Sequence, residues 1–170
     1  ENQLKFTHQY IDSIDNFKEV MSDAKRQNNI NFSSLKKIAD NSLQMDTNRD
    51  IVSMLSIVRS VDEYTFSHSI NVGILAMMFG RWAGLQEKEV KQLLYAGMLH
   101  DIGKAKIPDK ILNKRGPLTA QEYNIMKTHT VHGYQLTKSC MFITESVRQA
   151  VLLHHERNDG TGYPFAYPKE

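Results

Sequence analysis

Apolar residues recur every three or four positions along most of the chain, which is the spacing of amphipathic helices. No stretch alternates apolar and polar residues between turn residues, as a half-buried strand would. The pattern predicts helices over about residues 2–27, 33–44, 65–82, 87–102 and 144–156, and further helices starting at Thr47 and at Thr119. The predicted fold class is therefore all-α, a helical bundle.

Polar and turn-forming segments divide this pattern. Residues 103–118 are predicted to form a loop with a short turn, and the C-terminal segment NDGTGYPFAYPKE is rich in turn residues. Thr119 and Glu122 form a capping box, and the helix that it begins is expected to carry His129. The predicted organisation is an N-terminal helical segment over residues 1–48 and a main domain over residues 49–170.

Charge and cysteine content exclude several classes of protein. The 21 lysines and arginines and the 19 aspartates and glutamates give a net charge of +2, which offers no basis for binding DNA or an anionic membrane. The longest apolar runs are far too short to span a bilayer. The single cysteine excludes an internal disulfide and a multi-cysteine zinc site.

Histidines and one aspartate supply the candidate chemistry. Taken alone, each histidine is more often an ordinary helix residue than a metal ligand. Apolar runs precede both His100-Asp101 and His154-His155, which indicates burial, and a buried charge is costly unless it is paired or bound to metal. Nitrogen and oxygen ligands without thiolates suit Mn, Fe, Zn or Ni. Six ligands exceed what one tetrahedral ion needs, so a two-metal site bridged by Asp101 is predicted from this set: His68, His100, Asp101, His129, His154 and His155.

These candidates lie in an ordered string of motifs. His68 is followed by LHDIGK (99–104), His129 and HHERNDGTGYP (154–164). Together with IPDKILNKRGPLT (107–119), this order resembles the HD-GYP branch of the HD phosphohydrolases over about residues 62–164. The resemblance implies an all-α bundle around a binuclear metal centre in a cytoplasmic bacterial phosphodiesterase. That enzyme would hydrolyse cyclic di-GMP to linear pGpG, and further to GMP, in second-messenger signalling.

The resemblance also implies roles for residues. One metal would be held by His68, His100 and Asp101, and the second by Asp101, His129, His154 and His155. Lys104 matches a lysine that contacts the substrate phosphate or aids the leaving group, so Asp101 and Lys104 are the candidate catalytic residues. The candidate substrate-binding residues are Lys104, Gly162, Tyr163 and Pro164. Glu156 is expected either to orient one of the paired histidines or to be a solvated carboxylate.

Cofactors and partners follow from the same resemblance. Tyr64 stands where some members have a glutamate that recruits a third metal, so two divalent ions are expected, Fe or Mn first, with Zn, Ni and Co as further candidates. The implied partners are the cyclic dinucleotide substrate and diguanylate cyclases or other signalling proteins. The N-terminal helices either form a homodimer or cover the core.

The chain departs from the family pattern at its end. The family continues past GYP into a helix whose aspartate completes the shell of the first metal, whereas this sequence stops at Glu170. A missing C-terminal part is therefore expected, and the activity of the fragment itself stays open. Two other functions stay open as well: hydrolysis of another nucleotide, such as a hybrid cyclic dinucleotide, and a non-catalytic metal-binding module for signalling.

Overall fold

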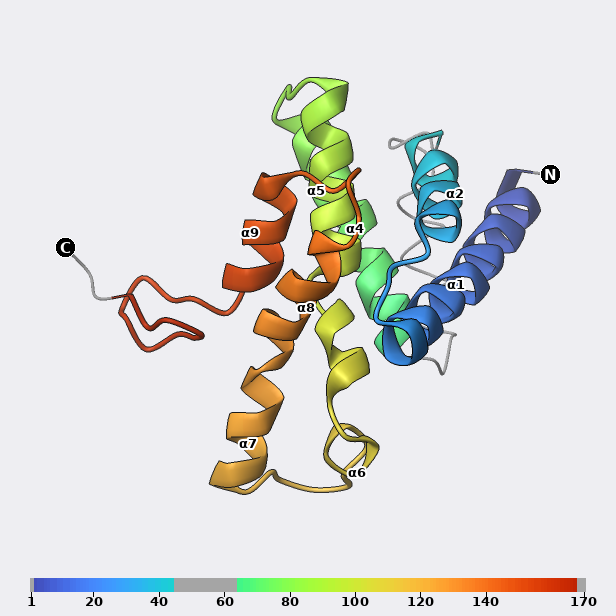
Figure 1. The fold of residues 1–170 in the computed structure, drawn as a ribbon. Helices are drawn as coiled ribbons and strands as arrows, with labels where there is room; N and C mark the ends of the chain where they lie inside the picture. Colours follow the sequence, from blue (N-terminus) through green and yellow to red (C-terminus); the bar gives the residue numbers. More distant parts are fainter. Residues whose placement is uncertain (1, 45–63, 168–170) are drawn as a thin grey trace. The chain divides into compact units, whose positions relative to one another are not determined.

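The computed structural model describes residues 2–44 and 64–167 (Figure 1). In these residues all regular secondary structure is helical, which confirms the predicted all-α class. The helix predicted from Thr47 and the predicted boundary near residue 48 lie outside the described residues. The chain divides into two compact units, residues 1–21 with 31–98 and residues 22–30 with 99–170.

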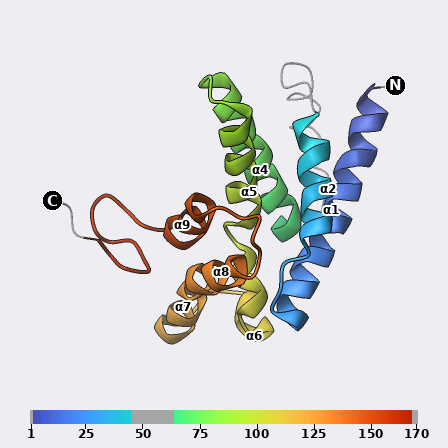
Figure 2. The ribbon, with the colours of Figure 1, turned by 45° about the horizontal axis from the view of Figure 1, so that its top comes forward.

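The first unit is built on amphipathic helices. Their apolar faces meet in a core whose fully buried side chains include Phe17, Leu35 and Leu94. In Figures 1 and 2, α1 lies beside α2 and α4 lies beside α5. Among the described residues, this unit is formed by α1 (Asn2–Gln27), α2 (Phe32–Leu43), α4 (Tyr64–Trp82) and α5 (Glu87–Leu99). The last residues of α1 and the last residue of α5 belong to the second unit.

Two contacts show how closely these helices pack. A Cβ atom added to Gly97 of α5 would lie 2.6 Å from the Cα atom of Gly73 in α4, so the two backbones meet with no side chain between them. The Tyr10 hydroxyl donates a hydrogen bond of 2.7 Å to Asn71 Oδ1 and joins α1 to α4. Most of the predicted apolar faces are therefore buried, but Leu75 and Trp82, predicted to lie on the apolar face of α4, are exposed.

The second unit holds five short helical elements. Helix α8 packs against both η1 and α9. A Cβ atom added to Gly103 of η1 would lie 1.8 Å from the carbonyl oxygen of His129 and 2.4 Å from the Gly133 nitrogen, so η1 lies directly on the α8 backbone. The elements are η1 (Ile102–Lys106), α6 (Asp109–Leu112), α7 (Ala120–Lys127), α8 (His129–Lys138) and α9 (Glu145–Leu153).

Several predicted helix ends were wrong, and each correction falls at a candidate ligand. Helix α5 ends at Leu99 rather than at residue 102, so His100 and Asp101 lie in a turn. The capping box at Thr119 is confirmed, but α7 ends at Lys127 because the backbone N–H and hydroxyl of Thr128 bond to carbonyls of its last turn. His129 therefore begins α8. Helix α9 ends at Leu153, before the paired histidines.

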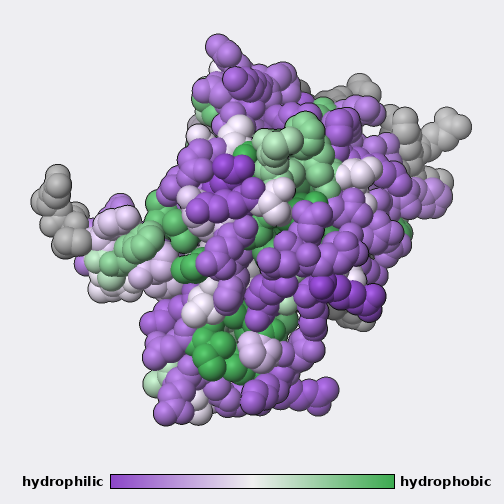
Figure 3. Space-filling model, viewed as in Figure 1, coloured by the Kyte–Doolittle hydropathy of each residue, from purple (hydrophilic) through white to green (hydrophobic). Residues whose placement is uncertain are grey.

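The surface of the second unit carries one helix that contributes nothing to a core. Helix α7 has no buried residue, and Ile125 is 41% exposed. Figure 3 shows hydrophobic atoms at the end of the molecule where Figure 1 has α6 and α7. Among the described residues, no helix has both the length and the apolar character needed to cross a membrane.

Candidate metal centre

The centre of the site is the Asp101 carboxylate, at the start of η1. It is only 6% exposed. Its Oδ2 atom lies 2.7 Å from Lys104 Nζ and 3.1 Å from His100 Nε2. Burial raises the pKa of Asp101, but the neighbouring side chains of His100, His129 and Lys104 outweigh burial and hold this pKa well below its usual range. Asp101 is therefore a buried anion at neutral pH.

Carbonyl groups at helix ends orient two of the imidazoles. Nδ1 of His129 donates to the carbonyl of Met126 at 2.8 Å, and Nδ1 of His154 donates to the carbonyl of Val151 at 2.9 Å. Both carbonyls belong to the last turn of a helix, α7 or α9, where carbonyls lack the N–H partner that one more turn of helix would supply. Because a carbonyl can only accept, the proton of each neutral ring is on Nδ1 and its Nε2 carries a lone pair.

These lone pairs converge on the carboxylate. The Nε2 atoms of His129 and His154 are 3.2 Å apart and lie 3.3 and 3.8 Å from Asp101 Oδ1. Three lone pairs facing one another repel, and a cation between them removes the repulsion. Two nitrogen ligands that each lie about 2.0–2.1 Å from one ion are about 3 Å apart. The residues present therefore fit a divalent metal.

Burial keeps the histidines in the form that binds metal. It lowers the pKa of His154 to about 4. The pKa of His155 is also lowered, first by partial burial and then by the neighbouring His129. Metal ligation requires the neutral imidazole. The ligand atoms of Asp101, His129, His154 and His155 all lie within 4.8 Å of one another, so this cluster could hold one ion.

The second unit thus brings together all but one of the predicted metal ligands. The ring of His100 lies edge-on to that of His154, with 5.1 Å between their centroids. His68 lies on α4 in the first unit, half-buried, and its part in the site stays a prediction. The adjacent His154 and His155 lie directly after the end of α9, and their ring centroids are 4.2 Å apart.

The loop after α9 folds back over the paired histidines. The Tyr163 ring stacks on His155 at 4.5 Å between centroids and 23° between planes, and the Tyr163 N–H donates to the carbonyl of His155. The loop can fold this closely only because residue 162 is a glycine: a Cβ atom at Gly162 would lie 2.4 Å from the Arg157 nitrogen. Pro164 follows Tyr163 through a cis peptide bond. The predicted loop beside the site is thus adjacent to a candidate ligand.

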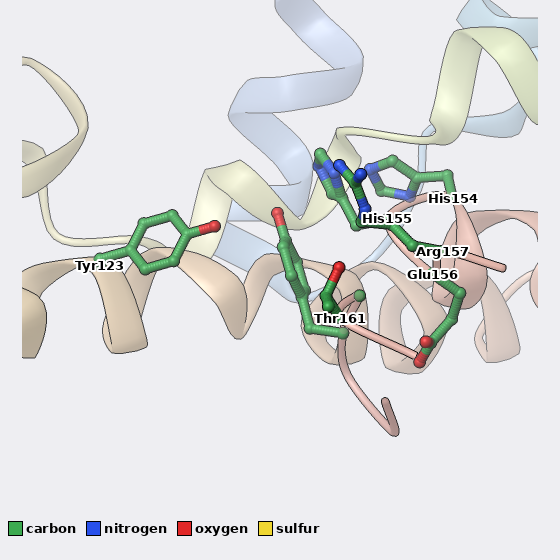
Figure 4. Close-up of a pocket in the computed structure, with 8 residues that line it drawn as sticks. Tyr123, His154, His155, Glu156, Arg157 and Thr161 are labelled. Carbon is green, nitrogen blue, oxygen red and sulfur yellow. The ribbon is translucent and has the colours of Figure 1, made fainter. Parts of the chain in front are cut away.

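Both expectations for Glu156 were wrong. Its Oε1 atom accepts the backbone N–H groups of Phe165 and Ala166, at 2.6 and 3.2 Å. In Figure 4 its carboxylate points away from the rings of His154 and His155. Glu156 therefore holds the loop and orients no histidine.

A pocket opens beside the cluster (Figure 4). Its volume is about 310 Å³, at the small end of the range for ligand pockets. Gly162 and Tyr163 of the predicted substrate-binding residues line it. The remaining lining residues are Tyr123, His154, His155, Glu156, Arg157 and Thr161.

Sequence reasoning missed two kinds of group here. The carbonyls of Met126 and Val151 have no side-chain signature. A histidine just past a helix end, three residues after a carbonyl of the last turn, is nevertheless a usable signal. Tyr123 was missed because an aromatic residue in a short helix ordinarily indicates packing.

The fold and the cluster define the class: an all-α protein with a histidine and aspartate centre of the kind that holds divalent metals. The model of the HD domain family matches residues 35–169. The chain belongs to the HD domain family, as the order of its motifs predicted.

Named relatives agree with this assignment. The chain is 42% identical over 119 residues to cyclic di-GMP phosphodiesterase PA4108 of Pseudomonas aeruginosa, covering 69% of this chain and 29% of that protein. It is 42% identical over 116 residues to a cyclic di-GMP phosphodiesterase of Thermotoga maritima, covering 68% and 31%. It is 34% identical over 121 residues to 3'3'-cGAMP-specific phosphodiesterase 2 of Vibrio cholerae, covering 70% and 23%. The chain spans less than a third of the length of these relatives.

Proposed function

We propose that this chain is the metal-binding part of a phosphodiesterase that hydrolyses a cyclic dinucleotide, cyclic di-GMP first, to the linear dinucleotide pGpG and further to GMP. The observation that carries the proposal is the convergence of Asp101, His129, His154 and His155 within 4.8 Å. The names of the relatives in Pseudomonas aeruginosa and Thermotoga maritima support the choice of substrate.

The proposed centre holds two divalent ions, Fe or Mn, with Zn, Ni and Co as alternatives. Asp101 has two carboxylate oxygens and is proposed to bridge the ions. His129, His154 and His155 complete the ligands of one ion, and His68 and His100 are proposed as ligands of the other. When bound, such a metal pair supplies a water of lowered pKa as nucleophile and neutralises charge on the phosphoryl group.

Lys104 is proposed to act on the substrate phosphate. Its ammonium lies 2.7 Å from Asp101 Oδ2, so a phosphoryl oxygen next to the cluster is within reach of the same group. A fixed positive charge at that place offsets the charge that develops on the phosphoryl oxygens in the transition state.

The first test is turnover by the metal-loaded chain. Incubation with Mn²⁺ or Fe²⁺ and cyclic di-GMP is expected to give the linear dinucleotide, and excess EDTA is expected to stop product formation. Metal analysis is expected to find about two ions per chain. Unchanged cyclic di-GMP with two ions bound overturns the proposal in favour of a non-catalytic module. If 3'3'-cGAMP is hydrolysed faster than cyclic di-GMP, the preferred substrate is a hybrid cyclic dinucleotide instead.

Replacing Lys104 with methionine is expected to lower kcat for cyclic di-GMP by about 10²–10³-fold, the usual effect of losing one charge-stabilising donor. The metal content is expected to be unchanged, because Lys104 is a cation and no ligand. Steady-state kinetics and metal analysis test both points. Lys110→Met, at an exposed position of α6, is the matched control. Equal kcat values for the two variants would remove Lys104 from the mechanism.

Other parts of the assignment are proposals of the same kind. We infer a cytoplasmic location, because a cyclic dinucleotide messenger is an intracellular substrate. Dimerisation through the N-terminal helices and contact with diguanylate cyclases are also proposed. The division of the chain into an N-terminal helical segment (residues 1–48) and a main domain (residues 49–170) is a further proposal.

A further inference from the structure

The Tyr123 ring is placed as a ligand-binding group rather than as a packing group. It is 49% exposed, on a helix with no buried residue, so no core accounts for it. The capping box fixes the start of that helix: Thr119 Oγ1 accepts the Glu122 N–H at 3.2 Å, and the Glu122 carboxylate accepts the Thr119 N–H at 2.7 Å. Tyr123 is the next residue, so its backbone is held while about half of the residue is exposed to solvent.

The ring also lies in the wall of the pocket, opposite the histidines. One face of Tyr163 is covered by His155, and the Tyr123 ring meets Tyr163 at 6.4 Å and 83°. In Figure 4 the Tyr123 hydroxyl points toward the paired histidines across the pocket. The pocket therefore has aromatic rings at its outer end and candidate metal ligands at its inner end.

Polar groups at the rim suit a ligand that is both flat and hydrogen-bonding. The Lys127 ammonium lies 5.3 Å from the centroid of the Tyr123 ring. Thr161 lines the pocket, and its hydroxyl and backbone N–H both donate to Asp159, which fixes that part of the loop. Aromatic walls with a few fixed polar groups are typical of sites for nucleobases, which stack on tyrosine and expose hydrogen-bonding edges.

We propose that this pocket binds one purine base of the cyclic dinucleotide, and that Tyr123 is the residue that stacks on it. The inference rests on the proposed function, because the phosphodiester next to that base must reach the metal centre. A pocket of about 310 Å³ suits part of a dinucleotide rather than the whole. Stacking on Tyr123 then selects for a large base and sets the register of the phosphate.

The test is binding of a hydrolysis-resistant phosphorothioate cyclic dinucleotide that carries 2-aminopurine, whose fluorescence is quenched when the base stacks. With the metal-loaded full chain, Tyr123→Leu is expected to weaken binding by roughly fivefold to a hundredfold and to relieve the quenching, because one stacked base is lost. Tyr123→Phe keeps the aromatic ring, so this variant is expected to retain both the binding affinity and the fluorescence quenching. With cyclic di-GMP as substrate, KM is expected to rise more in Tyr123→Leu than kcat falls, since a base contact stabilises the ground state and transition state alike.

Tyr134→Leu is the matched control. Tyr134 lies on α8 in the same unit, outside the pocket, where its hydroxyl donates to Glu145. Circular dichroism checks that each variant is folded. Equal affinity and equal quenching in Tyr123→Leu and Tyr134→Leu would overturn the role of Tyr123 while cyclic di-GMP hydrolysis by the unaltered chain continued. Absence of hydrolysis with intact stacking would instead overturn the proposed function.

Discussion

Replacing Asp101 with asparagine is expected to lower metal affinity by more than about 100-fold and to abolish turnover of cyclic di-GMP. Loss of a partner that only orients a ligand costs about 10–100-fold in metal affinity, and Asp101 is the proposed shared ligand itself. The neutral amide keeps the size of the side chain but removes the charge that faces His129 and His154 at 3.3 and 3.8 Å. Metal analysis after dialysis, followed by the turnover assay, measures both effects.

The control for this change is Asp109→Asn. Asp109 is an exposed carboxylate of the second unit, paired with Lys25 and far from any role in the proposed site, so metal content is expected to stay at two ions. If Asp101→Asn does not fold, His155→Gln serves in its place, because His155 is not one of the buried core residues and its loss leaves the core intact. Full metal occupancy in a folded Asp101→Asn chain would contradict the ligand assignment.

The fold class could be predicted from the sequence because it depends on periodicity. The apolar faces predicted for the helices near residues 10–17 and 87–98 are buried, and Gly84 ends its helix with a positive φ of 73°. The positions of the helix ends near the ligands could not be predicted. They depend on hydrogen bonds such as that from Thr128 to Ile125, which compete with one more turn of helix and leave no periodic trace.

The candidate ligands could be chosen from the sequence, but their arrangement could not. Histidine and aspartate in an ordered motif indicate the chemistry of the site. The distances between them depend on how η1, α8 and α9 pack, which is a tertiary property. The role of Glu156 was mistaken for the same reason, because its partners Phe165 and Ala166 come from a loop that folds back only in three dimensions.

Adding a single methyl group at Gly103 is therefore expected to damage the site more than the loss of most side chains around it. The Cβ atom of Gly103→Ala would lie 1.8 Å from the His129 carbonyl oxygen and 2.4 Å from the Gly133 nitrogen. Both are backbone atoms, so no side chain can turn aside and η1 must move off α8. The expected loss of unfolding free energy is about 3 kcal/mol, at the upper end of the range for overpacking. Urea unfolding of the metal-free chain measures it.

Gly80→Ala provides the contrast. A Cβ atom there would meet Leu93 Cδ1 at 2.8 Å, the far end of a flexible side chain, and alanine favours a helix interior by about 1 kcal/mol over glycine. Gly80→Ala is thus expected to be close to neutral. Asp101 directly precedes η1, and α8 begins with His129. The shift forced by Gly103→Ala therefore also separates the carboxylate from an imidazole, and metal affinity is expected to fall together with stability. A Gly103→Ala chain as stable and as metal-loaded as Gly80→Ala would mean that the contact between η1 and α8 does not set the geometry of the site.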